Sequence, residues 1–488
     1  MTEAHRNTPA NDAAGTGVQA TENSAASFGG QLSPGMAKRH LTMMGLGSAI
    51  GAGLFLGTGA AISTAGPAVL VSYIVAGFIV VLVMRMLGEM AAAMPAAGSF
   101  ATYAGAAFGR HARFAVGWLY WFMLIMVMGA EMTGASAIMG AWFGVSPWIP
   151  ALVCMVFFAV VNLVRVRAFG EFEFWFALIK VAVIIGFLII GILLIFGLLP
   201  GDSAVGTANL LDHGGFMPNG WSGVAAGLLA VAFAFGGIEI VAIAAAESDD
   251  PGRNVGFAVR SVIWRISVFY VGSVLVIATL LPWDTLRDAE TAEQSPFTAV
   301  LRMADIPGVV GFLEVIIVLA LLSAFNAQIY GTSRMSFALA KQGDGPRILA
   351  RTNKASSPSV AVYVSVFFGF VAVALQWLDW EDLLTFLLNA VGATLLIVWI
   401  AIALSQIKLR RELESRGPLE VKMWLFPWLS YLAIVVILAL GALMLTDEAA
   451  RAQIFAALAV VVVLAVLSAI NSNFHADSGA YVTEKTRS

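Results

Sequence analysis

The sequence reads Gly45-Leu46-Gly47-Ser48-Ala49-Ile50-Gly51-Ala52-Gly53 inside an apolar segment near residues 42–62. A second run, Ala234-Phe235-Gly236-Gly237-Ile238-Glu239, lies inside another apolar segment near residues 222–246. Each glycine in a helix interior costs about 1 kcal/mol relative to alanine. Both runs are therefore predicted to interrupt a helix, and these two interruptions decide the fold.

The composition around these runs is that of a membrane protein. The chain has 488 residues, of which 60% are hydrophobic and 12% are charged, whereas soluble domains carry about 25% charged residues. A helix needs about 20 apolar residues to span a bilayer, and twelve segments approach that length. They lie near residues 42–62, 67–88, 115–141, 148–164, 174–199, 222–246, 266–282, 308–333, 359–378, 383–405, 425–446 and 452–470.

The positive charges predict the orientation of these segments, because cytoplasmic loops are enriched in Lys and Arg. With the N-terminus inside, twelve spans place 23 of the 27 Lys and Arg residues on the cytoplasmic side. Arg287, Arg302 and Arg451 fall outside, and Lys180 falls within the membrane. Both termini are therefore expected in the cytoplasm of a bacterial cell, with the protein in the cell membrane.

The polar ends and the rare residue types exclude several other features. Residues 1–37 have no apolar core like that of a signal peptide and are expected to form a disordered cytoplasmic tail. Cys154 is the only cysteine, which excludes an intramolecular disulfide. A metal site, a histidine relay or a cofactor is not expected, because all five histidines fall in tails or loops. They are His5, His40, His111, His213 and His475.

The two interruptions are five predicted helices apart, so the first helix crosses outward and the sixth crosses inward. Paired broken helices in two inverted halves indicate a substrate site near the membrane midplane in a secondary transporter. One alternative is that the glycines only allow close helix packing, as the spacing of Gly47 and Gly51 would permit. A phosphate-binding loop is disfavoured, because no strand precedes the glycines.

A broken helix exposes N–H groups at the start of one half and carbonyl groups at the end of the other. We therefore expect the α-carboxylate of an amino acid to bind the backbone N–H groups of Ser48, Ala49, Ile50, Gly51, Ala52 and Gly53. We expect its α-ammonium group to bind carbonyls around Ala232, Phe233, Ala234 and Phe235.

Three charged residues lie within predicted spans. Insertion of a charged side chain at the bilayer centre costs about 2.5 to 3.5 kcal/mol. Glu131 has small neighbours, and it is expected to line the pocket or to carry a proton; a structural hydrogen bond is the alternative. Glu239 follows the second break, where structural and functional roles are both open. Lys180 is the third of these charged residues.

A polar stripe marks the eighth predicted span. Ser323, Asn326 and Tyr330 are three and four residues apart and share one helical face. Such a stripe is expected to face protein and not lipid. Its members either serve the transport pathway or form hydrogen bonds between helices.

Several motifs together resemble the amino-acid permeases of the amino acid, polyamine and organocation superfamily, over residues 38 to 470. The chain is most similar to the actinobacterial aromatic amino-acid permeases, with γ-aminobutyrate, proline and D-serine/alanine/glycine permeases as close relatives. The motifs are the run at residues 47–53, Gly88-Glu89-Met90, Glu131-Met132-Thr133, Lys180-Val181, Phe235-Gly236-Gly237-Ile238-Glu239 and Thr332-Ser333-Arg334-Met335.

The resemblance implies an all-α, LeuT-like fold with twelve transmembrane helices, in which helices 1 and 6 are broken. Five-helix repeats would occupy residues 38–199 and 200–407 in inverted orientation, followed by two helices in residues 408–472 and a cytoplasmic tail at 473–488. It also implies coupling to protons instead of sodium ions.

The resemblance further implies roles for single residues. Lys180 would replace the sodium ion, contacting Ser323 and the first helix near Gly47, and would carry the coupled proton; a permanently charged lysine paired with Glu131 or Glu239 is the alternative. Phe235 would cover the substrate, and Glu239 and Asn326 would lie near it. The glycines Gly129, Gly236 and Gly237 leave room for a large side chain.

The paired breaks predict a secondary transporter, and the resemblance implies an amino-acid:proton symporter that imports phenylalanine, tyrosine or tryptophan by alternating access. A permease for γ-aminobutyrate, proline or small neutral amino acids is the first alternative. A channel or a membrane-embedded enzyme is an alternative of a different class. No metal pattern or nucleophile-base pair supports the enzyme, and a channel would not accumulate solute against a gradient. The expected partners are an amino acid, a proton and the lipid bilayer, and no nucleic acid.

Overall fold

Long apolar helices make up most of the protein, as the hydropathy pattern predicts. A computed structural model describes residues 50–94, 99–164, 169–199, 204, 206–237, 239, 251–286, 295–352, 358–378, 380 and 383–484. The described part of residues 37–488 belongs to one compact unit. Its regular structure consists of helices, with no strand among the described residues.

The α-helices in chain order are α2 Ala52–Phe55, α3 Gly57–Ala65, α4 Val69–Ala93, α5 Ser99–Phe108, α6 Arg110–Phe143, α7 Trp148–Val164, α8 Phe169–Ile195, α9 Gly220–Phe235, α11 Pro251–Arg265, α12 Gly272–Leu280, α13 Pro296–Met303, α14 Val309–Lys341, α15 Ser359–Trp377, α16 Leu383–Arg416, α17 Trp428–Met444 and α18 Glu448–Glu484. A π-helix, η3 Ile266–Val271, joins α11 to α12, and the 3-10 helix η1 Gly66–Ala68 joins α3 to α4. Further 3-10 turns are η2 Ala208–Leu210, η4 Trp283–Leu286 and η6 Arg347–Ala350.

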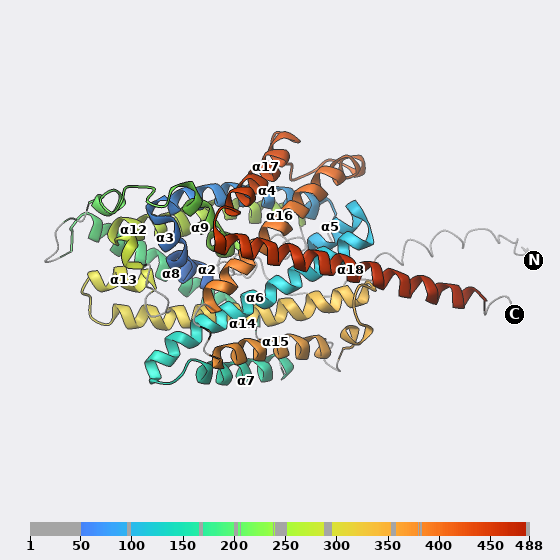
Figure 1. Cartoon of the computed structure of the whole chain (residues 1–488), viewed down its shortest axis with the longest axis horizontal. Coiled ribbons are helices and arrows are strands. Elements are labelled where there is room, and N and C mark those ends of the chain that lie inside the picture. Colours follow the sequence, from blue (N-terminus) through green and yellow to red (C-terminus); the bar gives the residue numbers. More distant parts are fainter. Residues whose placement is uncertain are drawn as a thin grey trace, which may run out of the picture. The chain divides into compact units, whose positions relative to one another are not determined.

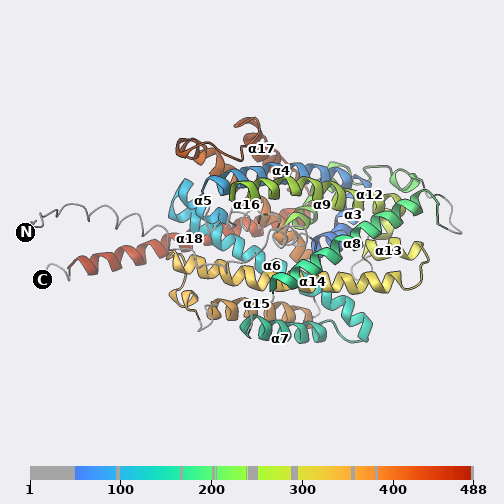
Figure 2. The same cartoon turned by 180° about the vertical axis from the view of Figure 1, so that it is seen from behind.

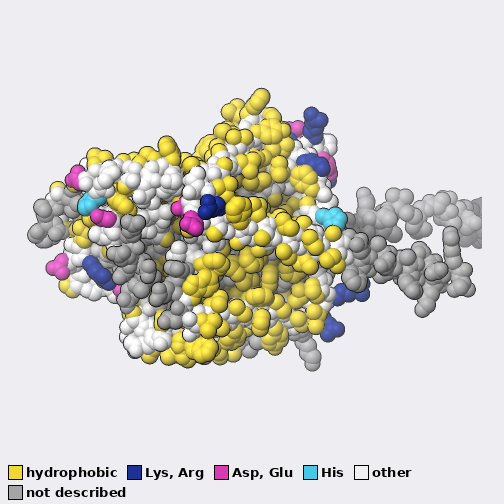
Figure 3. Space-filling model, viewed as in Figure 1, with side chains coloured by type: hydrophobic (Ala, Val, Ile, Leu, Met, Phe, Trp, Pro, Cys, Tyr) yellow, Lys and Arg dark blue, Asp and Glu magenta, His cyan; other side chains and the backbone are white. Residues whose placement is uncertain are grey.

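Eight helical segments of the described residues are long and apolar enough to cross a membrane. Three shorter apolar helices occur at Trp148–Asn162, Gly220–Phe235 and Trp428–Met444. Figure 3 shows one face on which hydrophobic side chains cover most of the middle, while charged side chains gather mainly toward the two ends. A surface of this kind matches the apolar interior of a bilayer.

Two groups of helices can be followed in Figures 1 and 2. In one group, α6 packs along α14, and α7 and α15 cover this pair. In the other group, α9 packs against α3 and α4, and α11 packs along α4. The long helix α16 contacts both groups, through α6 on one side and through α9 and α4 on the other.

Small residues allow the second group to pack with close backbone contacts. A Cβ atom at Gly227 of α9 would lie 3.2 Å from the carbonyl oxygen of Ala61 in α3. A Cβ atom at Gly392 of α16 would overlap the Leu229 carbonyl of α9. Ser72 of α4 also donates a hydrogen bond to the Val224 carbonyl, at 2.8 Å. The helix that carries the second break is therefore held on three sides.

Several helices extend beyond the predicted apolar segments, because the criterion of apolarity misses helical turns in polar sequence. The helix predicted at 383–405 continues to Arg416, where ion pairs four residues apart stabilise its polar end. The segment predicted to begin at 266 is preceded by the amphipathic helix α11. Two short helices, α5 and α13, were not predicted; α13 begins with Pro296 at its first position, which is a common start signal.

Candidate functional site

The first glycine-rich run contains the start of a short helix. Gly51 has extended backbone angles, and the short helix α2 starts at the next residue, Ala52. Leu56 then interrupts the path between α2 and α3. The N–H groups at the start of α2 have no partner within the helix, so they must be satisfied from outside it.

The side chain of Glu131 from α6 satisfies one of these groups. The Ala52 N–H group is shared between the two carboxylate oxygens of Glu131, at 3.2 and 3.1 Å. This contact requires glycine at position 51, because a Cβ atom there would lie 2.5 Å from the Glu131 Oε1 atom. Glu131 itself is only 4% exposed. A carboxylate thus accepts a hydrogen bond at the N-terminal end of α2.

The second break follows Phe235, where α9 ends at the predicted glycine pair. Gly236 has extended backbone angles and Gly237 has a φ of 89°, a conformation that favours glycine. The Glu239 carboxylate returns to this break and accepts a hydrogen bond from the Gly237 N–H group at 3.0 Å. Its other oxygen accepts a hydrogen bond from the Trp399 indole of α16 at 2.9 Å. Glu239 therefore stabilises the interrupted backbone.

The two interrupted helices touch directly. A Cβ atom at Gly53 would overlap the Ala234 backbone of α9, and it would lie 3.1 Å from the Phe233 ring. Gly57 lies near the same ring. The aromatic ring on the Gly53 and Gly57 face of the first helix is therefore that of Phe233.

Phe235 has a different environment. Its buried ring packs edge-on against Tyr73 of α4, with centroids 5.8 Å apart, and against Tyr270 of η3 at 4.9 Å. Thr58 of α3 donates to the Leu54 carbonyl at 2.6 Å, which leaves the Tyr73 hydroxyl to donate to Thr58 at 2.9 Å. This aromatic cluster connects α3, α4, α9 and η3 beside the breaks.

The buried amine of Lys180 on α8 contacts the residue that the resemblance implied. Its Nζ atom donates a hydrogen bond to the Ser323 Oγ atom of α14 at 3.3 Å, and the lysine is 2% exposed. Lys180 also interacts electrostatically with Glu131. The structure thus places the two charged residues of the predicted coupling group near each other.

Other predicted residues have different surroundings. Asn326 accepts a hydrogen bond from Asn162 of α7 at 2.7 Å, so its amide is directed to the outer helix pair. Ile50 and Ala232 are buried, as are the other residues of the expected carbonyl group. Gly47, Ser48, Ala49 and Ile238 lie outside the described residues. No group of three possible ligands for a metal ion occurs in the described ranges.

Sequence reasoning missed the aromatic cluster and the indole of Trp399. Tyr73 and Tyr270 lie in the second and seventh predicted spans. A tyrosine hydroxyl within an apolar segment usually has a hydrogen-bond partner, and this was the available signal. Their assembly around Phe235 depends on helix packing, which the sequence does not state.

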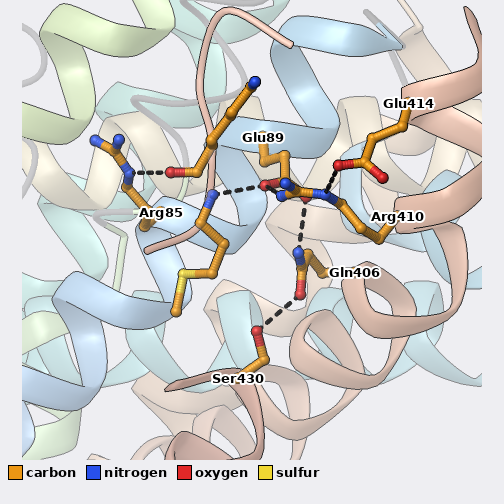
Figure 4. A network of polar contacts seen from close by, with 8 residues as sticks. Arg85, Glu89, Gln406, Arg410, Glu414 and Ser430 are labelled. Carbon is orange, nitrogen blue, oxygen red and sulfur yellow. Dashed lines mark hydrogen bonds and ion pairs between the residues drawn. The ribbon is translucent and has the colours of Figure 1, made fainter. Parts of the chain in front are cut away.

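A separate buried network surrounds Glu89 of the Gly88-Glu89-Met90 motif (Figure 4). Its carboxylate, which is fully buried, accepts hydrogen bonds from Arg410 and Gln406 of α16 and from the Met423 N–H group. Gln406 in turn accepts a hydrogen bond from Ser430 of α17 at 2.9 Å. The network ties α4 to α16, to the start of α17 and to the segment between these two helices.

Comparison with known proteins identifies the family. The family model described as amino acid permease matches residues 40–480 of the chain. The chain belongs to the amino acid permease family. It is a multi-pass membrane protein, and the interpretation as an amino-acid permease, in place of an enzyme, is confirmed.

Named relatives of this permease cover most of its length. The aromatic amino acid transport protein AroP of Corynebacterium glutamicum is 64% identical over 91% of this chain and 96% of its own. A probable GABA permease of Pseudomonas aeruginosa is 43% identical over 90% and 93%. AroP of Escherichia coli K12 is 39% identical over 80% and 84%.

Solved structures agree at the level of the fold. A crystal structure of a mutant manganese transporter from Eremococcus coleocola has a TM-score of 0.54 with this permease. The match covers 88% of this chain and 94% of the transporter, at 14% identity. At this identity the likeness concerns the fold alone.

Proposed function

We propose that this permease is a secondary active symporter that imports aromatic amino acids together with protons. The observation that carries the proposal is the contact between Glu131 and Ala52, beside the buried pair of Lys180 and Ser323. This region combines a broken helix end, a carboxylate and an amine. Together these groups can bind a zwitterionic amino acid and can accept or donate a proton.

The proposed topology has twelve spans, with both termini in the cytoplasm of the bacterial cell. Ala52–Ala93 is one of the eight long segments, but it contains two predicted spans that meet at Gly66, which has a φ of 65°. With these two counted separately, the eight long segments hold nine spans, and the three shorter apolar helices bring the number to twelve. Breaks in the first and sixth spans support the LeuT-like, five-plus-five inverted repeat.

Substrate binding is proposed to replace one carboxylate by another. The α-carboxylate of the amino acid would take the Ala52 N–H group that Glu131 holds, together with the neighbouring N–H groups from Ser48 to Gly53. The α-ammonium group would bind carbonyls at the end of α9, around Ala232 to Phe235. Since Gly53 and Ala234 are in contact, both half-sites lie within reach of one small molecule.

Proton coupling is proposed to act through the same exchange. Protonation of Glu131 weakens its hold on the Ala52 N–H group, because a carboxylate is a stronger acceptor than a neutral carboxyl group. Lys180 is the proposed carrier of the coupled proton, since its amine is buried, donates to the neutral hydroxyl of Ser323 and would bind the first helix when charged. Glu131 is the alternative carrier.

The proposed substrates are phenylalanine, tyrosine and tryptophan. The 64% identity to an aromatic amino acid transport protein over almost the whole length of both chains supports this choice. The alternative substrates are γ-aminobutyrate, proline or small neutral amino acids, and permeases named for γ-aminobutyrate are 39 to 44% identical.

Counterflow in proteoliposomes tests the proposed activity. Vesicles containing the purified protein are loaded with unlabelled L-phenylalanine and then diluted into labelled L-phenylalanine. We expect transient accumulation of label, which needs a carrier but no proton gradient. Label that enters no faster than into protein-free vesicles would contradict the proposal.

A further inference from the structure

Arg265, the last residue of α11, is a buried positive charge without a hydrogen-bond partner. It is 1% exposed, and its Nε, Nη1 and Nη2 atoms all lack a partner in the described structure. Other buried charged side chains of the described region, Glu89, Glu131 and Glu239, each accept at least one hydrogen bond. Arg265 is thus an exception among the buried charges.

An anionic partner would stabilise the buried guanidinium group of Arg265. A guanidinium group has five N–H donors and cannot be deprotonated in proteins. A buried charge that lacks both a counter-ion and hydrogen bonds is strongly unfavourable. A carboxylate is its most favourable partner, because the two groups form paired hydrogen bonds.

The surroundings of Arg265 connect it to the substrate site. Tyr270, five residues further along, interacts electrostatically with both Arg265 and Glu131. The Tyr270 ring packs on Phe235, the last residue of α9 before the break. Tyr270 therefore lies within electrostatic range of both Arg265 and the Glu131 carboxylate that binds the start of α2.

The backbone next to Arg265 is also irregular. The π-helix Ile266–Val271 begins directly after it and carries Tyr270. Single π-helical turns inside α-helices occur frequently at functional sites. The Ile266 side chain contacts the position of Gly77 on α4, so the turn is packed beside the aromatic cluster.

We infer that Arg265 forms a second, transient site for the carboxylate of the transported amino acid, on its way between the broken helices and the cytoplasm. The inference rests on the proposed function, because it assumes that the substrate is an amino acid and that α11 lies on the cytoplasmic side of the protein. A zwitterion that leaves the Ala52 N–H group on this side passes the Phe235 and Tyr270 rings, and Arg265 offers its carboxylate the next positive charge.

The test measures phenylalanine exchange from each face of oriented proteoliposomes. We expect Arg265→Gln to raise the apparent KM on the cytoplasmic face at least about tenfold and to leave that on the outer face within about twofold. Arg265→Lys retains the charge and is expected to restore most of the cytoplasmic affinity. Arg260→Gln is the matched control, because it removes an exposed arginine from the same helix and is expected to change neither face.

A second measurement uses the wild-type protein, in case Arg265→Gln does not fold. The probe is 3-phenylpropionate, which has the aromatic ring and the carboxylate but lacks the ammonium group. We expect it to inhibit exchange at least about tenfold more strongly from the cytoplasmic face, and 2-phenylethylamine to show no such difference.

The outcomes separate the two proposals. Absence of phenylalanine exchange by the wild-type protein overturns the proposed function and, with it, this inference. If the wild-type protein exchanges phenylalanine, equal KM values for Arg265→Gln and wild type on the cytoplasmic face overturn the inference alone. If that variant does not fold, equal inhibition by 3-phenylpropionate from both faces overturns it.

Discussion

The Ala52 N–H group and the Glu131 carboxylate form a shared hydrogen bond, at 3.2 and 3.1 Å, across the break of the first helix. The donor belongs to α2, which packs on α9, and the acceptor belongs to α6, so the contact joins the two helix groups at the proposed site. An α-carboxylate that binds here must compete with a carboxylate already present in the chain.

Substitution of Gly51 tests the location of the site. A side chain at this position overlaps the Glu131 Oε1 atom and fills the space in front of the Ala52 N–H group. We expect Gly51→Val to abolish phenylalanine binding in a scintillation proximity assay while the protein remains monodisperse. Gly186→Ala in α8 is the control, because a Cβ atom there meets open space. Wild-type affinity in Gly51→Val would contradict the assignment.

Replacing the competing carboxylate should strengthen binding. Hydrogen bonds to charged groups contribute about 1.5–3 kcal/mol and neutral ones about 0.5–1.5 kcal/mol. Glu131→Gln keeps the shape of the side chain but holds the Ala52 N–H group less firmly, by about 1 kcal/mol on this scale. We expect the Kd for phenylalanine to fall about fivefold. A large loss of affinity would instead indicate that Glu131 contacts the substrate directly.

Competition assays determine the specificity. Excess unlabelled tyrosine or tryptophan is expected to block uptake of labelled phenylalanine, and γ-aminobutyrate, proline or glycine is expected to have little effect. The expectation follows from the proposed aromatic substrates. Stronger competition by γ-aminobutyrate or glycine than by unlabelled phenylalanine would favour the alternative permease.

The Glu89 network is expected to determine stability. Removing one member of a buried ion pair leaves an uncompensated charge and costs about 3–5 kcal/mol. Arg410→Met should therefore lower the melting temperature markedly, whereas the double variant with Glu89→Gln should recover part of the loss. Arg416→Met is the control, because Arg416 pairs with Glu412 at the exposed end of the same helix. Equal melting temperatures for Arg410→Met and Arg416→Met would refute this role.

The sequence predicts the all-helical architecture, and two helix ends coincide with the glycine-rich runs. Glycine pairs are costly in helices wherever they occur, so the end of α9 at Phe235 and the start of α2 at Ala52 fall where the composition indicates. The contact of Lys180 with Ser323 followed from a family resemblance and not from spacing, since α8 and α14 are far apart in the sequence.

The partners of single side chains were less predictable. Asn326 contacts Asn162, and Phe235 packs on Tyr73 and Tyr270, because the rotation of each helix about its axis decides which neighbour a side chain meets. Periodicity states which residues share a face but not which helix that face contacts. The contact between Glu131 and Ala52 was missed for a related reason. Every residue except proline has a backbone N–H group, so the residue type does not indicate which of these groups a side chain binds.

Accumulation driven by a proton gradient tests the central claim of proton-coupled transport most directly. Proteoliposomes at equal internal and external phenylalanine receive an acidic exterior, and internal phenylalanine is measured over time. We expect the wild-type protein to accumulate phenylalanine above the external concentration. We expect Lys180→Met to exchange phenylalanine without accumulating it, because the proposed proton carrier is missing. Failure of the wild-type protein to accumulate substrate under the gradient would contradict the claim, and wild-type accumulation by Lys180→Met would contradict the role of Lys180.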